Sequence, residues 1–330
     1  MNLPQDFIAL SQKIGADPLL VQGPGGNTSI KLDGRMWIKA SGTKLAEALN
    51  TNVFVAVDPA KALLELDGDG DGSCRSALID SQSSLRPSIE TTFHAMFNKK
   101  FVFHFHSVGV ICHAISHEGR EAMTEKMAGL SWVSAPYRKP GVPLTKAIRK
   151  AVGDREVQVV VLENHGVIIL DDEIGKTEAL IDDVEMRLSL PELTQANGED
   201  GEAKYTGWEE VPEVSALAKN STMYKRAVSG SYYPDHVVFL GPALPSMTSS
   251  QLKKLDPIDF PAPVVLVAAE GVYIKSNATP AQRAMLNCVY HVLSRIPDHW
   301  TLAPIGEKAE IELLNWDAEK YRQALAKRGI

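Results

Sequence analysis

The sequence contains few cysteines, and they are not arranged in pairs. Cys74, Cys112 and Cys288 are the three cysteines, and none belongs to a C-x-x-C pair. This scarcity argues against a thiolate metal site. It suits a reducing cytoplasm, where we expect the protein to reside and its thiols to be buried as small hydrophobic side chains.

Positive charge is not in excess either. The 34 Lys and Arg residues are outnumbered by 41 Asp and Glu residues, which gives a net charge of -7. Nucleic acids and anionic membrane surfaces require concentrated Lys and Arg, so we expect neither partner. The apolar run 101–115 is too short to span a bilayer and carries three histidines. A G-x-G-x-x-G motif after a strand is also missing, which argues against a dinucleotide-binding domain.

An HFH triplet lies within the apolar run FVFHFH (101–106), which predicts a β-strand. Alternate strand residues share a face, so His104 and His106 project together while Phe105 turns into the core. Two imidazoles on one face suit a borderline-soft ion such as Zn²⁺. A histidine in a strand is more often an ordinary hydrogen-bonded residue, and the pattern alone leaves both interpretations open.

A carboxylate precedes the triplet. The segment RPSIETTFHAMF (86–97) predicts a helix that begins at Pro87 and Ser88, with an apolar stripe along one side. Glu90 and His94 are four residues apart and would lie on one face of this helix. Glu90 is therefore a candidate base, with a pKa that we expect a dry pocket to raise.

A further histidine follows the triplet. His165 lies in the β-branched run VQVVVLENHGVIIL (157–170) and is followed by Gly166, where the absent Cβ lets backbone approach closely. Three histidines with an open fourth position are typical of catalytic rather than structural zinc sites. The remaining histidines have no comparable setting, and the YYPDH segment around His236 is left without a role.

Five motifs resemble those of the class II aldolase/adducin family and occur in the same order. They are GPGGNTSIK (23–31), KASGTKLAEA (39–48), RPSIETTFH (86–94), HFHSVGVICHAIS (104–116) and ENHGVII (163–169). Each motif is weak alone, but together they are specific. The likeness is greatest to the aldolase part of rhamnulose-1-phosphate aldolase/alcohol dehydrogenase proteins.

The resemblance implies roles for individual residues. It makes His104, His106 and His165 the ligands of Zn²⁺ or another divalent metal, and it gives Glu90 the acid/base position. It also implies a substrate or phosphate site at these residues: Gly26, Asn27, Ser41, Gly42 and Ser88. One departure is Ile89, which stands where the aldolases commonly carry a second small hydroxyl residue, so one phosphate contact is missing.

The resemblance and the sequence pattern together predict two α/β units. We expect residues 1–195 to form a three-layer α/β/α class II aldolase-like fold with a mixed, largely antiparallel sheet. Residues 196–208 are the expected linker, and 209–330 the expected smaller α/β module, of unknown role. Within the module, DHVVFLG (235–241) predicts a strand, whereas 279–296 and 315–329 predict helices.

The expected function is zinc-dependent cleavage of a ketose through an enediolate that the metal stabilises. The substrate class that the resemblance favours is a ketose 1-phosphate such as a deoxy-sugar phosphate. The resemblance also implies that the enzyme is a homotetramer. A sugar-phosphate epimerase or a sugar-acid phosphate decarboxylase would use the same site. An alternative of another class is a non-catalytic, adducin-like interaction module, although such domains lose the zinc histidines.

Overall fold

The computed structural model describes residues 3–68, 72–194 and 204–327. We call 3–194 the N-terminal unit and 204–327 the C-terminal module. The N-terminal unit contains a seven-stranded sheet with the order β3-β2-β1-β4-β7-β6-β5. Neighbouring strands are antiparallel except β5 and β6, which are parallel. The strands are β1 (Asn27–Leu32), β2 (Arg35–Lys39), β3 (Phe54–Val57), β4 (Phe101–Phe105), β5 (Trp132–Ala135), β6 (Val159–Leu162) and β7 (Gly166–Asp171).

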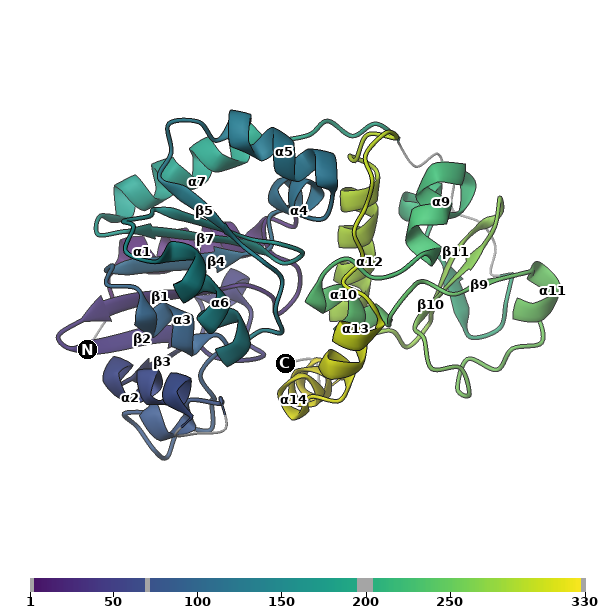
Figure 1. The fold of residues 1–330 in the computed structure, drawn as a ribbon. Coiled ribbons are helices and arrows are strands. Elements are labelled where there is room, and N and C mark those ends of the chain that lie inside the picture. Colours follow the sequence, from purple (N-terminus) through teal and green to yellow (C-terminus); the bar gives the residue numbers. More distant parts are fainter. Residues whose placement is uncertain (1–2, 69–71, 195–203, 328–330) are drawn as a thin grey trace.

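Helices cover both faces of this sheet, which confirms the expected three-layer α/β/α architecture (Figure 1). One face packs on α1 (Gln5–Ala16), α4 (Val108–Ala114), α5 (His117–Lys126) and α7 (Ile174–Leu188). The opposite face packs on α2 (Pro59–Leu64), α3 (Thr91–Met96) and α6 (Val142–Val152). The two faces of β4 therefore serve different purposes: Phe103 and Phe105 enter the first core, whereas His104 turns to the other side.

The C-terminal module is a smaller α/β unit built around a four-stranded sheet with the order β8-β11-β10-β9. Its strands are β8 (Trp208–Glu210), β9 (Ser246–Met247), β10 (Val264–Val267) and β11 (Gly271–Lys275). Its helices are α8 (Ala216–Lys219), α9 (Ser221–Val228), α10 (Pro234–Leu240), α11 (Ser249–Leu252), α12 (Pro280–Leu293), α13 (Glu307–Leu314) and α14 (Asp317–Lys327). Residues 195–203, most of the expected linker, lie outside the described residues, and Tyr205 and Trp208 already belong to the core of the second sheet.

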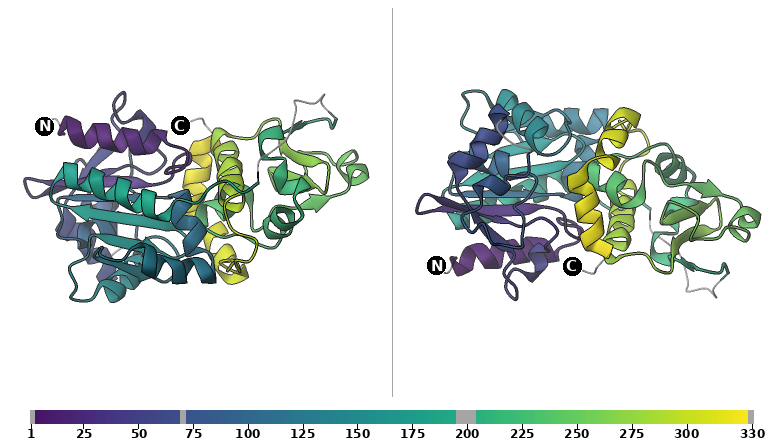
Figure 2. Two further views of the ribbon diagram at one scale, coloured as in Figure 1. Left: turned by 90° about the horizontal axis from the view of Figure 1, so that it is seen from above. Right: turned by 90° about the horizontal axis from the view of Figure 1, so that it is seen from below.

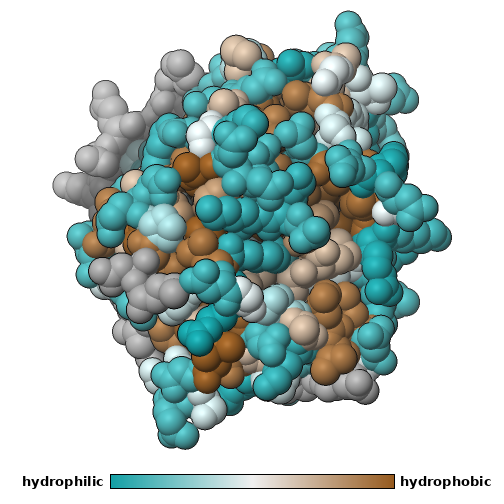
Figure 3. Space-filling view, turned by 90° about the vertical axis from the view of Figure 1, so that its left-hand side faces the viewer, coloured by the Kyte–Doolittle hydropathy of each residue, from teal (hydrophilic) through white to brown (hydrophobic). Residues whose placement is uncertain are grey.

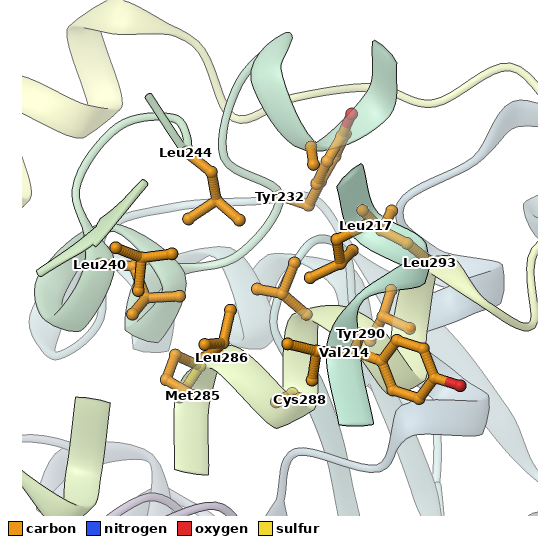
Figure 4. Close-up of a cluster of buried hydrophobic side chains, with 14 of the residues drawn as sticks. Val214, Leu217, Tyr232, Leu240, Leu244, Met285, Leu286, Cys288, Tyr290 and Leu293 are labelled. Atoms are coloured by element: carbon orange, nitrogen blue, oxygen red, sulfur yellow. The ribbon is translucent and has the colours of Figure 1, made fainter. Parts of the chain in front are cut away.

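The two units share one hydrophobic core. Val108, Ile111 and Cys112 of α4 are buried in the same cluster as residues of the C-terminal module, including those labelled in Figure 4. Burial of apolar surface on both sides of α4 stabilises this contact. Figure 2 shows the consequence: the C-terminal helices α13 and α14, in yellow, lie against the N-terminal unit rather than apart from it.

Two local predictions were wrong. Residues 235–240, expected as a strand, are part of helix α10, which begins at Pro234 and is buried on every side. Burial on all sides removes the polar face that would mark a helix, and proline favours a first helical turn. The helix expected from Pro87 begins only at Thr91, and Glu90 is the residue before it.

The outer surface is mixed in character. Figure 3 shows the face of the N-terminal unit opposite the C-terminal module, where hydrophilic side chains cover much of the surface and apolar ones form separate patches. Among the described residues, none of the helices has the length and apolarity needed to cross a membrane.

Candidate functional site

The end of β4 brings two of the predicted histidines to one place. His104 lies opposite Asn27 of β1 and Ile168 of β7, so it occupies the middle of the sheet. His106 follows the strand directly, and both imidazoles are buried. Nδ1 of His104 lies 3.0 Å from the carbonyl oxygen of Val167. A ring nitrogen beside a carbonyl carries the proton, which leaves Nε2 of His104 as a lone-pair donor.

The third histidine lies in the turn between β6 and β7. Asn164 in this turn has a left-handed backbone (φ 54°), a conformation that asparagine tolerates. Its side-chain amide donates to the carbonyl oxygens of Tyr232 and Ala303 at 3.0 and 2.7 Å, which anchors the turn to the C-terminal module. A Cβ on Gly166 would lie 2.5 Å from the carbonyl oxygen of Phe105. The glycine therefore allows His165 to approach the other two histidines.

The three imidazoles converge on one point. The ring centroids of His104, His106 and His165 are 4.9 to 5.1 Å apart. One ring nitrogen from each can be chosen so that all three lie within 4.8 Å of one another. Burial lowers the pKa of His106 to about 3, although the Asp235 carboxylate raises it. Burial also lowers the pKa of His165 to about 3, although the Glu90 carboxylate raises it. Both imidazoles are therefore neutral at physiological pH, as metal ligands must be.

Glu90 completes the cluster. Its Oε2 lies 3.3 Å from Nε2 of His104, and its Oε1 lies 3.7 Å from Nε2 of His165. Glu90 Oε1 and His104 Nε2 are buried without a hydrogen-bond partner among the described residues. Unpartnered buried acceptors are costly, and a divalent cation satisfies several of them at once. The donor set of three imidazoles and one carboxylate thus fits the metal that the sequence predicts.

The pKa of Glu90 shifts in the direction opposite to the expectation. Burial raises this pKa, but His104 and His165, together with a hydrogen bond from Asn27, outweigh burial and lower it. A dry pocket alone would favour the neutral acid. The surrounding donors instead keep Glu90 ionised, as a metal ligand or a base must be.

Asn27 and His94 support Glu90 from behind. The Asn27 amide donates to Glu90 Oε2 at 2.8 Å, and its carbonyl oxygen lies 2.5 Å from Nε2 of His94. The other ring nitrogen of His94 lies 2.8 Å from the hydroxyl of Ser29. His94 therefore fixes the orientation of Asn27, and Asn27 in turn orients the carboxylate. The side chain of Asn27 is engaged with Glu90 rather than free.

The residues predicted to hold the substrate or its phosphate line one cavity with the histidine cluster. Gly26, Asn27, Ser41, Gly42 and Ser88 all border this cavity, together with Glu90, His106 and His165. The cavity volume is only about 30 Å³, room for ordered water rather than for a sugar. A larger groove of about 340 Å³ adjoins it, and Ser41 and Ile89 line both spaces.

Three charged residues of the cavity were given no role from the sequence. Lys39 of β2 is buried and donates to the carbonyl oxygen of Pro24 at 2.9 Å, and burial lowers its pKa to about 7. Asp235 of α10 and Arg322 of α14 come from the C-terminal module. Burial raises the pKa of Asp235, but the Arg322 guanidinium outweighs burial and lowers it to about 2. Two sequence signals include two of these residues, since Lys39 begins the KASGTKLAEA motif and YYPDH contains Asp235. Nothing in either indicates a contact with His106.

Comparisons with known proteins match about half of the chain. The chain is 31% identical over 179 residues to "Uncharacterized oxidoreductase YuxG" of Bacillus subtilis (strain 168), which is 50% of this chain and 26% of that protein. The chain thus spans about a quarter of this curated relative.

Two solved structures are similar to part of the chain. The N-terminal class II aldolase domain of a conserved protein from Thermoplasma acidophilum has a TM-score of 0.49 at 24% identity, over 56% of this chain and 90% of that one. L-fuculose-1-phosphate aldolase from Thermus thermophilus has a TM-score of 0.36 at 16% identity, over 56% of this chain and 92% of that one. The family described as "Class II Aldolase and Adducin N-terminal domain" matches residues 5–189, more than half of the sequence. The chain therefore belongs to the class II aldolase and adducin family.

Proposed function

We propose that this chain is a divalent-metal-dependent lyase, an aldolase that cleaves a ketose. The substrate class is a ketose 1-phosphate such as a deoxy-sugar phosphate, and the expected metal is Zn²⁺. One observation carries the proposal: three buried histidines each offer a ring nitrogen within 4.8 Å of the other two, and the buried Glu90 carboxylate lies beside two of them. Structural zinc sites are closed by four protein ligands, usually with cysteine among them, whereas sites of this composition support catalysis.

The residues of the site have two roles: some hold the metal, and one transfers a proton. His104, His106 and His165 would hold the metal, which supplies positive charge to stabilise the enediolate formed when the C–C bond breaks. Glu90 accepts or returns the proton of the reacting sugar, because it is ionised and Asn27 fixes its position. The buried setting excludes bulk water, so the electrostatic interactions act at low dielectric.

The substrate requires more space than the cavity beside the histidines provides. We propose that the non-reacting end of the sugar occupies the adjoining groove, which Arg86 and Tyr321 border. Ile89 lies where the two spaces meet, and it offers no hydroxyl to a phosphate. Ser41, Ser88 and the Arg86 guanidinium are among the polar groups that line the two spaces. Leu325 of α14 lies close to Gly42, which lines the cavity.

The first experiment is the metal content of the purified protein, measured by mass spectrometry. We expect about one divalent ion per chain, and a protein that stays metal-free after incubation with Zn²⁺ contradicts the proposal. The second is a panel of ketose phosphates, pentose phosphates and keto sugar acids. Release of an aldehyde supports the aldolase, inversion at one carbon supports an epimerase, and release of CO₂ supports a decarboxylase.

A non-catalytic, adducin-like role is the alternative of another class. The complete histidine cluster argues against it, because an interaction module needs no buried, unpartnered imidazoles.

A homotetramer in the cytoplasm belongs to the proposal as well. Cys112 and Cys288 are buried free thiols, which suits a reducing compartment. Light scattering of the purified protein tests the tetramer.

A further inference from the structure

Asp235 of the C-terminal module contacts a metal-site histidine of the N-terminal unit. Its Oδ2 lies 3.5 Å from Nδ1 of His106, and both side chains are buried. The contact is made on Nδ1, so the other ring nitrogen, Nε2, is the one left for the metal. Asp235 lies beyond residue 189, where the match to the family ends, so the N-terminal unit alone does not contain this contact.

A buried arginine holds Asp235 in place. Arg322 of α14 donates to both carboxylate oxygens of Asp235, at 2.9 and 3.2 Å, and to the carboxylate of Glu319 at 2.9 and 3.0 Å. A two-point Arg–carboxylate contact fixes orientation as well as charge. Asp235 is thereby kept as an acceptor that faces His106, with its rotation blocked.

The glycine-rich loop leaves room for this contact. A Cβ on Gly25 would lie 3.0 Å from Nδ1 of His106 and 3.1 Å from Oδ2 of Asp235. Both contacts are tighter than ordinary van der Waals distance, so a side chain at this position would press on the pair. The second glycine of GPGG therefore faces the His106–Asp235 contact.

We propose that Asp235 is a positioning residue of the metal centre: it accepts the Nδ1 proton of His106 and so directs Nε2 to the metal. This inference rests on the proposed metal site. Metal-bound histidines commonly donate their second nitrogen to a carboxylate, which fixes the tautomer and makes the ligand more basic. The C-terminal module thus completes the metal centre of the N-terminal unit.

Metal affinity of the full chain tests the proposal. We expect Asp235→Asn to weaken Zn²⁺ binding by about 10- to 100-fold, the range found when such carboxylates are removed. Competition with a chromophoric chelator measures the dissociation constant, and melting of the metal-free protein reports folding. Glu319→Gln is the matched control, because it changes a carboxylate of the same Arg322 network that does not contact His106. We expect its Zn²⁺ affinity to stay within about threefold of that of the wild type.

The outcomes separate this inference from the proposed function. A wild-type protein that binds no Zn²⁺ removes the metal site itself. A wild type that binds, with Asp235→Asn binding equally well, overturns only the role of Asp235. Equal losses in Asp235→Asn and Glu319→Gln also overturn it, because the effect would then come from docking of α14.

A spectrum of the unmutated protein decides the question if Asp235→Asn does not fold. In ¹⁵N–¹H spectra of the zinc-loaded imidazoles, we expect His106 to be protonated on Nδ1 and to coordinate through Nε2. Protonation or coordination in the reverse arrangement contradicts the proposal.

Discussion

Glu90 has more neighbours than a simple base needs. Its two oxygens face His104 and His165, and Asn27 holds one of them from behind. The resulting balance leaves the carboxylate ionised although it is buried. A group of this kind can be both a temporary metal ligand and an acceptor of substrate protons.

Glu90→Gln separates these two tasks. Three histidines remain to hold the metal, so we expect near-normal metal content, whereas an amide cannot accept a proton. Turnover of the substrate found in the panel should fall by about 10²- to 10⁴-fold, the range for general acid–base groups. Metal analysis and initial rates on the same preparation provide the test. Undiminished turnover would remove Glu90 from the mechanism.

Gly166 is the second residue whose role is narrow enough to test. An alanine Cβ would meet the carbonyl oxygen of Phe105 at 2.5 Å and the Cα of His106 at 3.3 Å. Backbone on both sides of the contact cannot yield without moving the histidines. We expect Gly166→Ala to cost about 1–3 kcal/mol of unfolding free energy, as overpacking does, and to weaken metal binding.

Urea unfolding and the chelator competition measure these two effects. Gly175→Ala in α7 is the control, because nothing lies within 4 Å of a Cβ built there. If Gly166→Ala bound metal and unfolded like Gly175→Ala, the close approach at Gly166 would not matter.

At the scale of elements, the start of α4 connects the metal site to α7. Ser107 caps α4 by accepting from the backbone N–H of Val110 at 3.1 Å, and its hydroxyl donates to Glu185 of α7 at 2.9 Å. Burial raises the pKa of Glu185 to about 7, although the Ser107 hydrogen bond lowers it. Its other oxygen has no hydrogen-bond partner among the described residues.

This raised pKa predicts a pH-dependent stability. The folded state favours the protonated form of Glu185. The contribution of this preference to the unfolding free energy is therefore complete below the pKa that Glu185 has in the unfolded chain. The contribution is lost as pH rises towards about 7, the folded-state pKa. Glu185→Gln has no charge to bury, and we expect it to be more stable than the wild type at pH 8 by up to about 3 kcal/mol. At pH 4 the two should be nearly equal.

Unfolding in urea at both pH values measures this difference. Glu178→Gln in the same helix is the control, because the Glu178 side chain is about half-exposed and pairs with Lys13. An equal pH dependence in the wild type and Glu185→Gln would show that Glu185 is ionised in the folded protein.

The strand predicted at FVFHFH was confirmed as β4, because its aromatic and β-branched residues favour a strand even when both faces are buried. The β-branched run around ENHG forms β6 and β7. Helix α10 was missed because all seven of its residues are buried, so its sequence has no helical period. Glu90 lies outside α3, because the turn at Ser88 precedes the helix.

At the scale of the whole molecule, we expect metal binding and folding to be coupled. The three candidate ligands come from β4, from the residue after it and from the β6–β7 turn, and the turn is tied through Asn164 to the C-terminal module. A ligand that binds only the folded state stabilises it by about 4 kcal/mol at a thousand times its dissociation constant. We therefore expect saturating Zn²⁺ to raise the melting temperature by several degrees, and a chelator to reverse the effect.

Two histidine variants show whether this stabilisation comes from the proposed site. His104→Gln should lose most of the Zn²⁺-dependent shift in melting temperature. His299→Gln should keep it, since His299 is an exposed residue of the C-terminal module. A shift that survives in His104→Gln would place the metal elsewhere.

The sequence by itself determined which residues are candidate ligands, because the alternation of a strand and the motifs around it are local patterns. His104 and His106 share a strand face, Glu90 precedes them, and His165 stands before Gly166 in its β-branched run. The tertiary structure alone decided what surrounds that set. Asp235 and Arg322 reach the cavity because α4 shares a hydrophobic core with the C-terminal module, and α14 then closes over Gly42. Contacts between distant segments depend on how cores pack, and no local pattern of residues records them.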